Sequence, residues 1–372
     1  MIEEKKINKG MMLEEILRLY FLRSGFFVVR GVPFKFSGED LTDVDLWLYE
    51  RPTGTTRRVQ ICDIKYKKSP KAIERIFWTA GLAKILQTDG AYVATTDKRK
   101  NLRPVAKKLG IQIIDGLDLD RIKRSFTVSK QNRISNEDFL CLLQHVDTEY
   151  KNRKFYNIYM DILTTISDGF GTLSAVRNLD IFRHLASDIV AYPPNSKIVS
   201  VSLRLAYLAA AIVCESLDYI SIGAAFRPIE EKKAIILEAI RFGALNKSSL
   251  NLALSLIEKY SPAGSSASLV IKKALKNDLN KIPAEIIAEQ AIRLLSGENN
   301  LFTVGKNLEE AAYRLDPPSF DALDINSKCM IAAFLDYAGI NRDQFVKVWK
   351  YEEKETLFQR DKSTGEKQKT LF

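Results

Sequence analysis

The chain has 372 residues, 46% of them hydrophobic and 27% charged, which predicts a soluble globular protein with two or three domains and a sizeable buried core. It contains only two histidines and no G-x-x-x-x-G-K-[ST] motif, which argues against His-rich zinc hydrolases, HNH nucleases, HD phosphohydrolases and P-loop ATPases. Its four cysteines are widely separated, which favours reduced thiols over disulfides or a zinc site.

The net charge of +10 is carried by one part of the chain. Residues 1–130 contain 26 Lys and Arg against 16 Asp and Glu, whereas residues 131–372 contain 30 of each. Because neutralising phosphates releases counterions, this concentration favours a nucleic acid as partner of the amino-terminal third. Solubility is the simpler alternative explanation of the same charge.

The amino-terminal residues MIEEKKINKG have no apolar core of the kind found in signal peptides, so we expect an intracellular, cytoplasmic protein. The longest apolar run, Leu205 to Cys214, is followed directly by Glu215. This run is too short to cross a bilayer, and we expect no membrane partner.

The first predicted element is an amphipathic helix from Met11 to Ser24, ending at Gly25. Its apolar stripe has the spacing i, i+3, i+4, i+7, i+8 and consists of Leu13, Ile16, Leu17, Tyr20 and Phe21. Glu14 lies at the border of this stripe, from where its carboxylate could face the edge of a sheet that the helix covers.

Three predicted strands follow. Phe26 to Arg30 is aromatic and β-branched; after a polar loop containing Pro33 and Gly38, residues 41–49 form a second strand that opens with Asp43 and Asp45. The third strand covers residues 59–68, VQICDIKYKK, and strand alternation places Asp63 and Lys65 on the same face.

A carboxylate and an ammonium group in an apolar strand need partners, because burying an unpaired charge is costly. A divalent metal ion held by Asp63, with Lys65 beside an activated water, is one explanation. An ordinary charge pair on a half-exposed strand is the other.

The rest of the amino-terminal part alternates between helices and strands. We expect a helix from Lys71 to Gln87 with Ile73, Ile76, Phe77 and Ala80 on one side. We further expect a strand at Ala91–Thr95, a helix at Asn101–Leu109 and a strand at Ile111–Ile114. The predicted fold class is therefore an α/β amino-terminal domain, with a mixed sheet flanked by helices, followed by a larger all-α domain.

The second part of the chain has mainly helical spacing. We expect a basic linker at 121–134, a helical domain at 135–351 with breaks near 192–196 and 260–268, and a carboxy-terminal tail at 352–372 with a disordered end. The expected helix boundaries are a capping box at Ser135 and Asp138, starts at Pro228 and Pro283, and stops at Gly243 and Gly297.

Several motifs in residues 10–116 occur in an order and spacing that resemble one known superfamily. Gly10 and Glu14 open the first helix, Asp45 heads the second strand, and Asp63-Ile64-Lys65 lies in the third. Gly25-Phe26, GAYVATT and GIQIIDG complete the pattern, which resembles the PD-(D/E)xK, restriction-endonuclease-like nucleases. It is most similar to the branch with Holliday-junction resolvases and Mrr-type enzymes, and it assigns residues 1–120 to a nuclease-like domain.

Two positions depart from the pattern of that superfamily. Asp63 stands where glutamate is commoner, and Val44 stands where proline usually precedes the acid of the second strand. Asp43 competes with Asp45 for the ligand role. We favour Asp45, because the apolar body of the strand follows it directly.

The resemblance implies a Mg²⁺-dependent deoxyribonuclease, with Mn²⁺ as a possible substitute. Asp45, Asp63 and the backbone carbonyl of Ile64 would bind the metal, since Mg²⁺ prefers oxygen ligands. Lys65 would orient the attacking water or help to deprotonate it, and Glu14 would be an outer acid. The candidate phosphate-binding residues are Lys67, Lys68, Lys71, Arg75, Lys98, Arg99 and Arg103.

For the helical domain we expect a protein partner or a homodimer contact, and for the whole chain, by analogy, a role in restriction or anti-phage defence. One alternative is a catalytically silent nuclease-fold subunit that binds nucleic acid or scaffolds a complex. A lesser alternative is a ribonuclease similar to the HEPN family, based on Arg177-Asn178 and His184 in an R-N-x5-H pattern.

Overall fold

The structure is a computed structural model that describes residues 9–36, 38–67, 70–125, 132–151, 154–194, 196–243, 247–260, 267–295 and 297–348. Lys68, the tail at 352–372 and residues 126–131 of the expected linker lie outside the described residues.

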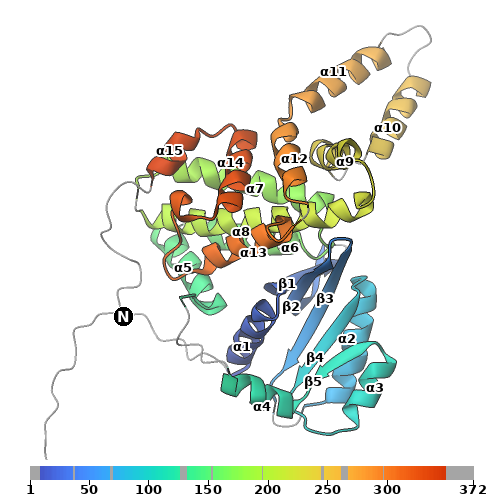
Figure 1. Cartoon of the computed structure of the whole chain (residues 1–372), viewed down its shortest axis with the longest axis vertical. Helices are drawn as coiled ribbons and strands as arrows, with labels where there is room; N and C mark the ends of the chain where they lie inside the picture. The colour runs from blue at the N-terminus through green and yellow to red at the C-terminus, as the bar shows by residue number, and fades with distance from the viewer. Residues whose placement is uncertain are drawn as a thin grey trace, which may run out of the picture.

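A five-stranded mixed sheet forms the amino-terminal unit (Figure 1). The strands lie in chain order and are β1 Phe27–Phe36, β2 Glu39–Thr53, β3 Thr56–Lys65, β4 Gly90–Thr95 and β5 Ile111–Ile114. β1, β2 and β3 pair antiparallel, whereas β3, β4 and β5 pair parallel. The expected mixed sheet flanked by helices is therefore present.

The first two strands are longer than the sequence indicated, and the expected polar loop at Pro33 is wrong. Pro33 lies inside β1, where its residue partner is Asp43 of β2. A proline donates no ladder hydrogen bond, but β1 is an edge strand, and edge strands tolerate this loss.

Helices cover both faces of the sheet. α1 Lys9–Arg23 and α4 Gly116–Ser125 pack on one face, and α2 Ala72–Ile85 and α3 Leu102–Lys108 pack on the other. Because α4 continues to Ser125, the first residues of the expected linker belong to a helix that packs on the sheet.

The expected apolar side of α2 is only partly correct. Ile76 is buried, but Ile73 and Phe77 are exposed, and the buried face contains Ala72, Thr79 and Ala83. The spacing i, i+4, i+7, i+11 from Ala72 defines one helical face, which the sheet covers. Ile73 and Phe77 lie beside that face.

The remainder of the chain is mostly helical, as expected, and several of the predicted helix boundaries are confirmed. Its helices are α5 Asn136–Glu149, α6 Lys154–Thr164, α7 Thr172–Ala191, α8 Lys197–Ile220, α9 Ile229–Phe242, α10 Lys247–Tyr260, α11 Ala267–Lys281, α12 Ala284–Arg293, α13 Leu301–Tyr313, α14 Ile325–Ala338 and α15 Arg342–Lys347. Ser135 and Asp138 form the capping box, Pro228 and Pro283 directly precede α9 and α12, and Gly243 follows α9.

α8 is the central helix of this region, and α10 and α11 project away from its body (Figure 1). The segment Lys197–Ala224 is long and apolar enough to cross a membrane by length and composition alone, but 94% of its most apolar window is buried inside the fold. Burial among α7, α13 and other helices explains this apolar composition, as in a core helix.

The two units share one hydrophobic core. α6 packs on β1, and the ring of Phe170 contacts the rings of Phe27 and Tyr49 from the sheet. At the same junction Arg18 of α1 and Arg133 both bind Glu309 of α13. The sheet is therefore held against the helices by apolar packing and by buried ion pairs.

Candidate functional site

The first candidate ligand, Asp45, lies where β2 and β3 separate. The antiparallel pairing of the two strands ends with Leu46 and Cys62. Beyond that pair, Asp45 Oδ2 accepts a 2.6 Å hydrogen bond from the backbone N–H of Ile64. The Asp45 carboxylate thus accepts the hydrogen bond that a backbone carbonyl of β2 would accept in a regular sheet, because a buried N–H needs an acceptor.

The backbone of β1 bends opposite Asp45. Arg30 pairs with Leu46 and Val32 pairs with Val44, so Gly31 lies across from Asp45. Gly31 has φ +67°, a conformation that glycine adopts readily and other residues rarely adopt. Asp43, the competing acid, is exposed and lies nearer the start of β2. The geometry therefore distinguishes the two acids and favours Asp45.

Asp63 and Lys65 follow on the neighbouring strand. Strand alternation places both on the side of the sheet that α2 covers. Arg75 of α2 binds both carboxylate oxygens of Asp63, with 2.8 Å from Arg75 Nε to Oδ2. Lys65 is half-buried and has no ion-pair partner among the residues that the structure describes.

Burial and the nearby Glu14 raise the pKa of Asp45 from 3.8 to about 6, although the N–H of Ile64 and the cations Arg75 and Lys65 act in the opposite direction. These groups are thus close enough to interact electrostatically. Asp45 is partly protonated near neutral pH, and any cation that binds there must displace this proton.

The substitution Asp45→Asn is expected to stabilise the fold above about pH 6. The folded pKa lies above the unfolded one, so the contribution of Asp45 to stability is fully present below about pH 4 and is lost as the pH rises through about 6. This loss is at most about 3 kcal/mol, or about 1 to 2 kcal/mol after solvent screening. An asparagine avoids the loss and can still accept from Ile64.

Urea denaturation at several pH values measures this effect. The stability difference between Asp45→Asn and the parent should grow from about zero near pH 4 to its full size near pH 7.5. Asp43→Asn, on the exposed acid, serves as the control and should change stability by less than about 0.5 kcal/mol. A difference that does not depend on pH would contradict the inferred pKa of Asp45.

Glu14 is held by an arginine that the sequence did not point to. Arg30 of β1 donates to Glu14 Oε2 through Nη2 at 2.6 Å and through Nε at 3.0 Å. The same guanidinium binds Glu15 and also Glu137 at the start of α5. Glu14 therefore lies near Asp45 but belongs to an ion cluster that joins the sheet to the helical region.

The candidate phosphate-binding residues lie beyond the carboxyl ends of β3 and β4, which share one edge because Lys65 pairs with Thr95. Most of their charges are paired. Lys71 contacts Glu74, Lys98 contacts Asp120, Arg99 contacts Asp97, and Arg103 contacts Asp115 and Asp118. Lys67 is exposed, and its carbonyl accepts from the Thr96 hydroxyl at 2.6 Å.

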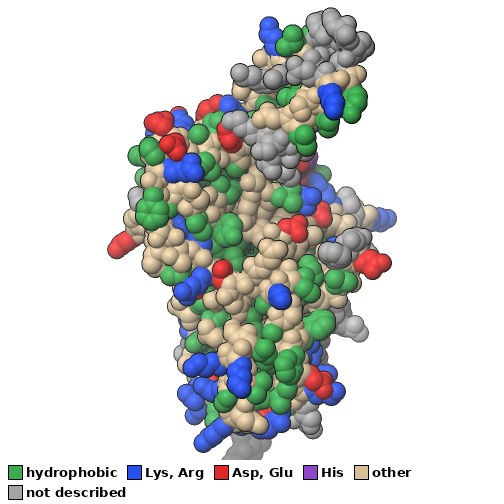
Figure 2. Space-filling view, turned by 90° about the vertical axis from the view of Figure 1, so that its right-hand side faces the viewer, with side chains coloured by type: hydrophobic (Ala, Val, Ile, Leu, Met, Phe, Trp, Pro, Cys, Tyr) green, Lys and Arg blue, Asp and Glu red, His purple; other side chains and the backbone are tan. Residues whose placement is uncertain are grey.

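Apolar side chains are exposed along α2, which begins beside this edge. Ile73, Phe77, Trp78 and Ile85 are all more than a third exposed, and Arg75 lies 5.8 Å from the centre of the Trp78 ring. Figure 2 views this side of the molecule and shows hydrophobic side chains gathered on the sheet unit, with Lys and Arg side chains toward its lower end. Aromatic and basic groups thus adjoin the candidate acids.

The donor set fits a hard cation. Among the described residues, no three His, Cys, Asp or Glu side chains gather closely enough to hold a metal ion. Mg²⁺ needs only one or two protein carboxylates, because waters and substrate phosphates complete its coordination. Asp45 and Asp63 are the two carboxylates that a cation would need here, and in this structure Arg75 provides positive charge beside Asp63.

The residues of the helical alternative lie on α7. Asn178 is fully buried and donates to Thr165 Oγ1 at 2.7 Å and to the Ser174 carbonyl. His184 is exposed, and its Nδ1 lies 2.8 Å from the carbonyl oxygen of Asp180. Asn178 is thus directed into the helical core, while the imidazole of His184 faces outward.

Sequence reasoning missed two buried acids of α8. Asp218 is fully buried and binds Arg51, Arg57 and the hydroxyl of Tyr49. Glu215 is also fully buried, and its burial raises its pKa well above 4.5. The sequence did contain a signal for them, namely two acids in a mostly apolar helix. A buried acid needs a partner or must be protonated.

A comparison of the chain with protein-family models finds no match, and comparisons with curated proteins and with solved structures find none either. The function must therefore be inferred from the residues and their geometry.

Proposed function

We propose that the protein is a metal-dependent endonuclease that hydrolyses phosphodiester bonds, with DNA as its substrate. One observation carries this proposal: two carboxylates, Asp45 and Asp63, come from neighbouring strands at the point where those strands separate, with Lys65 next on the same face. The sheet flanked by helices is compatible with the PD-(D/E)xK nuclease fold that the motifs resemble.

Asp45, Asp63 and the carbonyl of Ile64 would hold Mg²⁺ or Mn²⁺. Such an ion would lower the pKa of a bound water and neutralise charge on the phosphate. Arg75 would have to release Asp63 when the cation binds, because both need the same carboxylate. Arg75 would then be free to contact a phosphate of the DNA.

The remaining groups position the reactants. The Lys65 ammonium orients the attacking water and stabilises negative charge that develops on the phosphate. Glu14, fixed by Arg30, adds negative charge near Asp45. Flanking phosphates of the DNA would be bound by the basic residues at this end of the sheet. Those residues that now contact a carboxylate would exchange it for a phosphate; the set is Lys67, Lys71, Lys98, Arg99 and Arg103.

Binding of Mn²⁺ is expected to weaken below about pH 6, because the cation and a proton compete for Asp45. Below that pH, each further decrease of one pH unit should weaken Mn²⁺ binding about tenfold through protonation of Asp45 alone. Above about pH 7 the affinity should no longer change with pH. Calorimetric titration from about pH 5 to pH 8 measures this dependence. Asp45→Asn should bind weakly with little change over this range; an equally strong pH dependence in that variant would argue against Asp45 as the group responsible.

Cleavage of supercoiled plasmid DNA with Mg²⁺ or Mn²⁺, and its absence with a chelator, tests the activity. A protein that binds DNA but never cuts it would instead be the silent nucleic-acid-binding or scaffolding subunit. Cleavage of RNA in the presence of a chelator, lost in His184→Ala, would identify the helical ribonuclease. A place in a restriction or anti-phage system, with a partner or second copy bound by the helical region, is part of the same proposal.

A further inference from the structure

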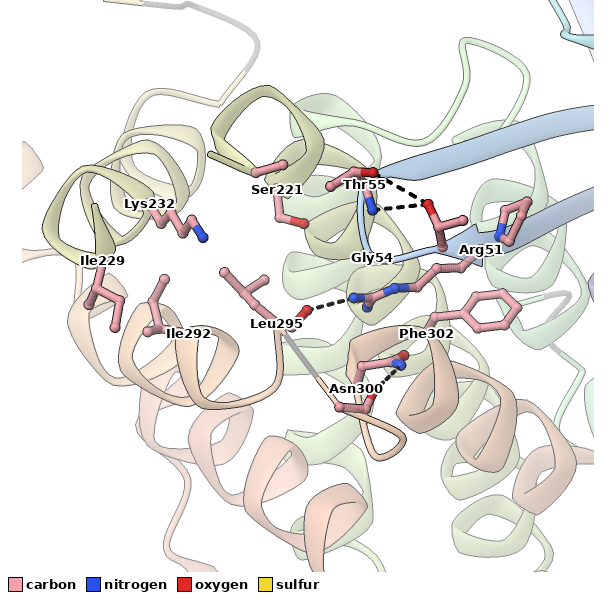
Figure 3. A pocket seen from close by; sticks show the side chains of 14 residues that line it. Arg51, Gly54, Thr55, Ser221, Ile229, Lys232, Ile292, Leu295, Asn300 and Phe302 are labelled. Carbon is pink, nitrogen blue, oxygen red and sulfur yellow. Dashed lines mark hydrogen bonds between the residues drawn. The ribbon is translucent and has the colours of Figure 1, made fainter. Parts of the chain in front are cut away.

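The end of the β2–β3 hairpin opposite the candidate acids borders a cavity of about 540 Å³ between the sheet and the helices (Figure 3). Its walls come from the turn Pro52–Thr55, from α9, from the end of α12 and from the start of α13. Pockets of about 300 to 1,000 Å³ at the junction of two structural units are typical small-molecule sites.

The charge of the lining is positive. Among the residues that the structure describes, Arg51 and Lys232 line the cavity and no Asp or Glu does. Lys232 has no ion-pair partner among the residues that the structure describes, and Figure 3 shows its ammonium group directed into the space. Arg51 and Arg57 share the single carboxylate of Asp218. Glu215 also lies near Arg51 and Arg57, but burial raises its pKa well above 4.5 and favours its neutral form. Positive charge is therefore in excess here, and an anion would balance it.

The rest of the lining includes apolar side chains. Ile229 and Ile292 lie beside Lys232, whereas Leu295 and Phe302 lie nearer Arg51 (Figure 3). Arg51 is fixed there, because it donates to Asp218 Oδ1 at 2.7 Å and to the Leu295 carbonyl at 2.6 Å. An occupant would thus combine an anionic group near Lys232 with a flat or apolar body against Leu295 and Phe302.

Hydroxyl groups also line the cavity. Ser221 donates its hydroxyl proton to the Asp218 carbonyl at 2.6 Å, and Thr53 Oγ1 accepts from the N–H of Thr55 at 3.2 Å. Ser221 Oγ retains capacity to accept a hydrogen bond, and so does Thr53 Oγ1 when its own proton is donated to Thr55 Oγ1, which lies 3.4 Å away. Such acceptors suit the hydroxyl groups of a sugar.

We propose that this cavity binds a nucleoside phosphate of mononucleotide size, with its phosphate at Lys232, its sugar near Ser221 and Thr53, and its base against Leu295 and Phe302. The cavity is separate from the candidate nuclease site. It lies at the turn end of the β2–β3 hairpin, whereas the candidate acids lie at the other end of the same strands. Its occupant would join the β2–β3 turn to α9 and α12.

Calorimetric titration of the full chain with AMP, adenosine and inorganic phosphate, without divalent metal, tests the proposal. AMP should bind at least about tenfold more tightly than either part alone, because both the phosphate and the base contribute. Lys232→Met and Ala225→Phe, which remove the charge and fill the cavity, should each weaken AMP binding at least about tenfold.

Two control variants separate this site from other surfaces. Lys233→Met, on the next residue of α9 where the lysine contacts Glu289, should bind AMP within about twofold of the parent. Lys65→Ala, at the candidate catalytic edge, should also bind AMP within about twofold of the parent. This expectation holds whether or not the protein is a nuclease. Absence of AMP binding up to about 5 mM, or unchanged binding in Lys232→Met, would overturn the proposal.

Discussion

Replacing Lys65 with alanine is expected to abolish metal-dependent DNA cleavage while leaving DNA binding largely intact. The side chain has no ion-pair partner among the described residues, so its removal leaves no buried charge unpaired. Its ammonium group orients the attacking water and stabilises the charge that develops on the phosphate. Both interactions stabilise the transition state more than they stabilise bound DNA. We expect a rate loss of at least about a thousandfold, or about 4 kcal/mol of barrier.

Plasmid cleavage and DNA binding should be measured on the same preparation, with circular dichroism to verify folding. Asp63→Ala should lose cleavage in the same way. Lys281→Ala, on the projecting helix α11, removes an exposed lysine far from the sheet and should leave both properties unchanged. Loss of DNA binding together with cleavage in a folded Lys65→Ala protein would argue that Lys65 holds DNA and does not assist the chemistry.

Replacing Asp218 with asparagine is expected to destabilise the whole molecule. This carboxylate is fully buried and accepts from Arg51, Arg57 and Tyr49, so its loss leaves two nearly buried guanidinium groups without their ion-pair partner. Breaking one partner of a buried ion cluster costs about 3 to 5 kcal/mol. Because the sheet and the helices share one core, we expect a single unfolding transition at lower denaturant concentration.

Guanidinium chloride unfolding of Asp218→Asn and of a matched control measures this cost. Asp180→Asn removes the same charge from an exposed pair with Arg183 and should change stability by less than about 1 kcal/mol. A loss for Asp218→Asn no larger than that of the control would mean that the two arginines find other partners or water. The junction would then depend on apolar packing alone.

The two expected results concern opposite ends of the same strands. Lys65 and Asp63 lie at the end of β3, whereas Arg57 at its start is bound to Asp218 of α8. The helical region thus holds the turn end of the hairpin through Asp218, and it also contacts β1 near Asp45 through the pair of Arg30 with Glu137.

Local signals in the sequence were sufficient for much of the fold. The order of helices and strands, the capping box at Ser135, and the helix starts after Pro228 and Pro283 depend on residues close together in the chain. Strand alternation likewise placed Asp63 and Lys65 on one face, because the period of two is a property of the strand itself. The excess charge of residues 1–130 was also readable directly.

Long-range pairing decided the remaining features. Arg75 reaches Asp63 across 12 residues, Arg30 reaches Glu14 across 16, and Arg18 reaches Glu309 across 291. No periodicity encodes such partners, since they depend on which strands pair and which helix covers them. The bend at Gly31, the buried acid Asp218 and the cavity at Lys232 likewise arise only when separate segments pack, because burial and charge compensation are properties of the assembled core.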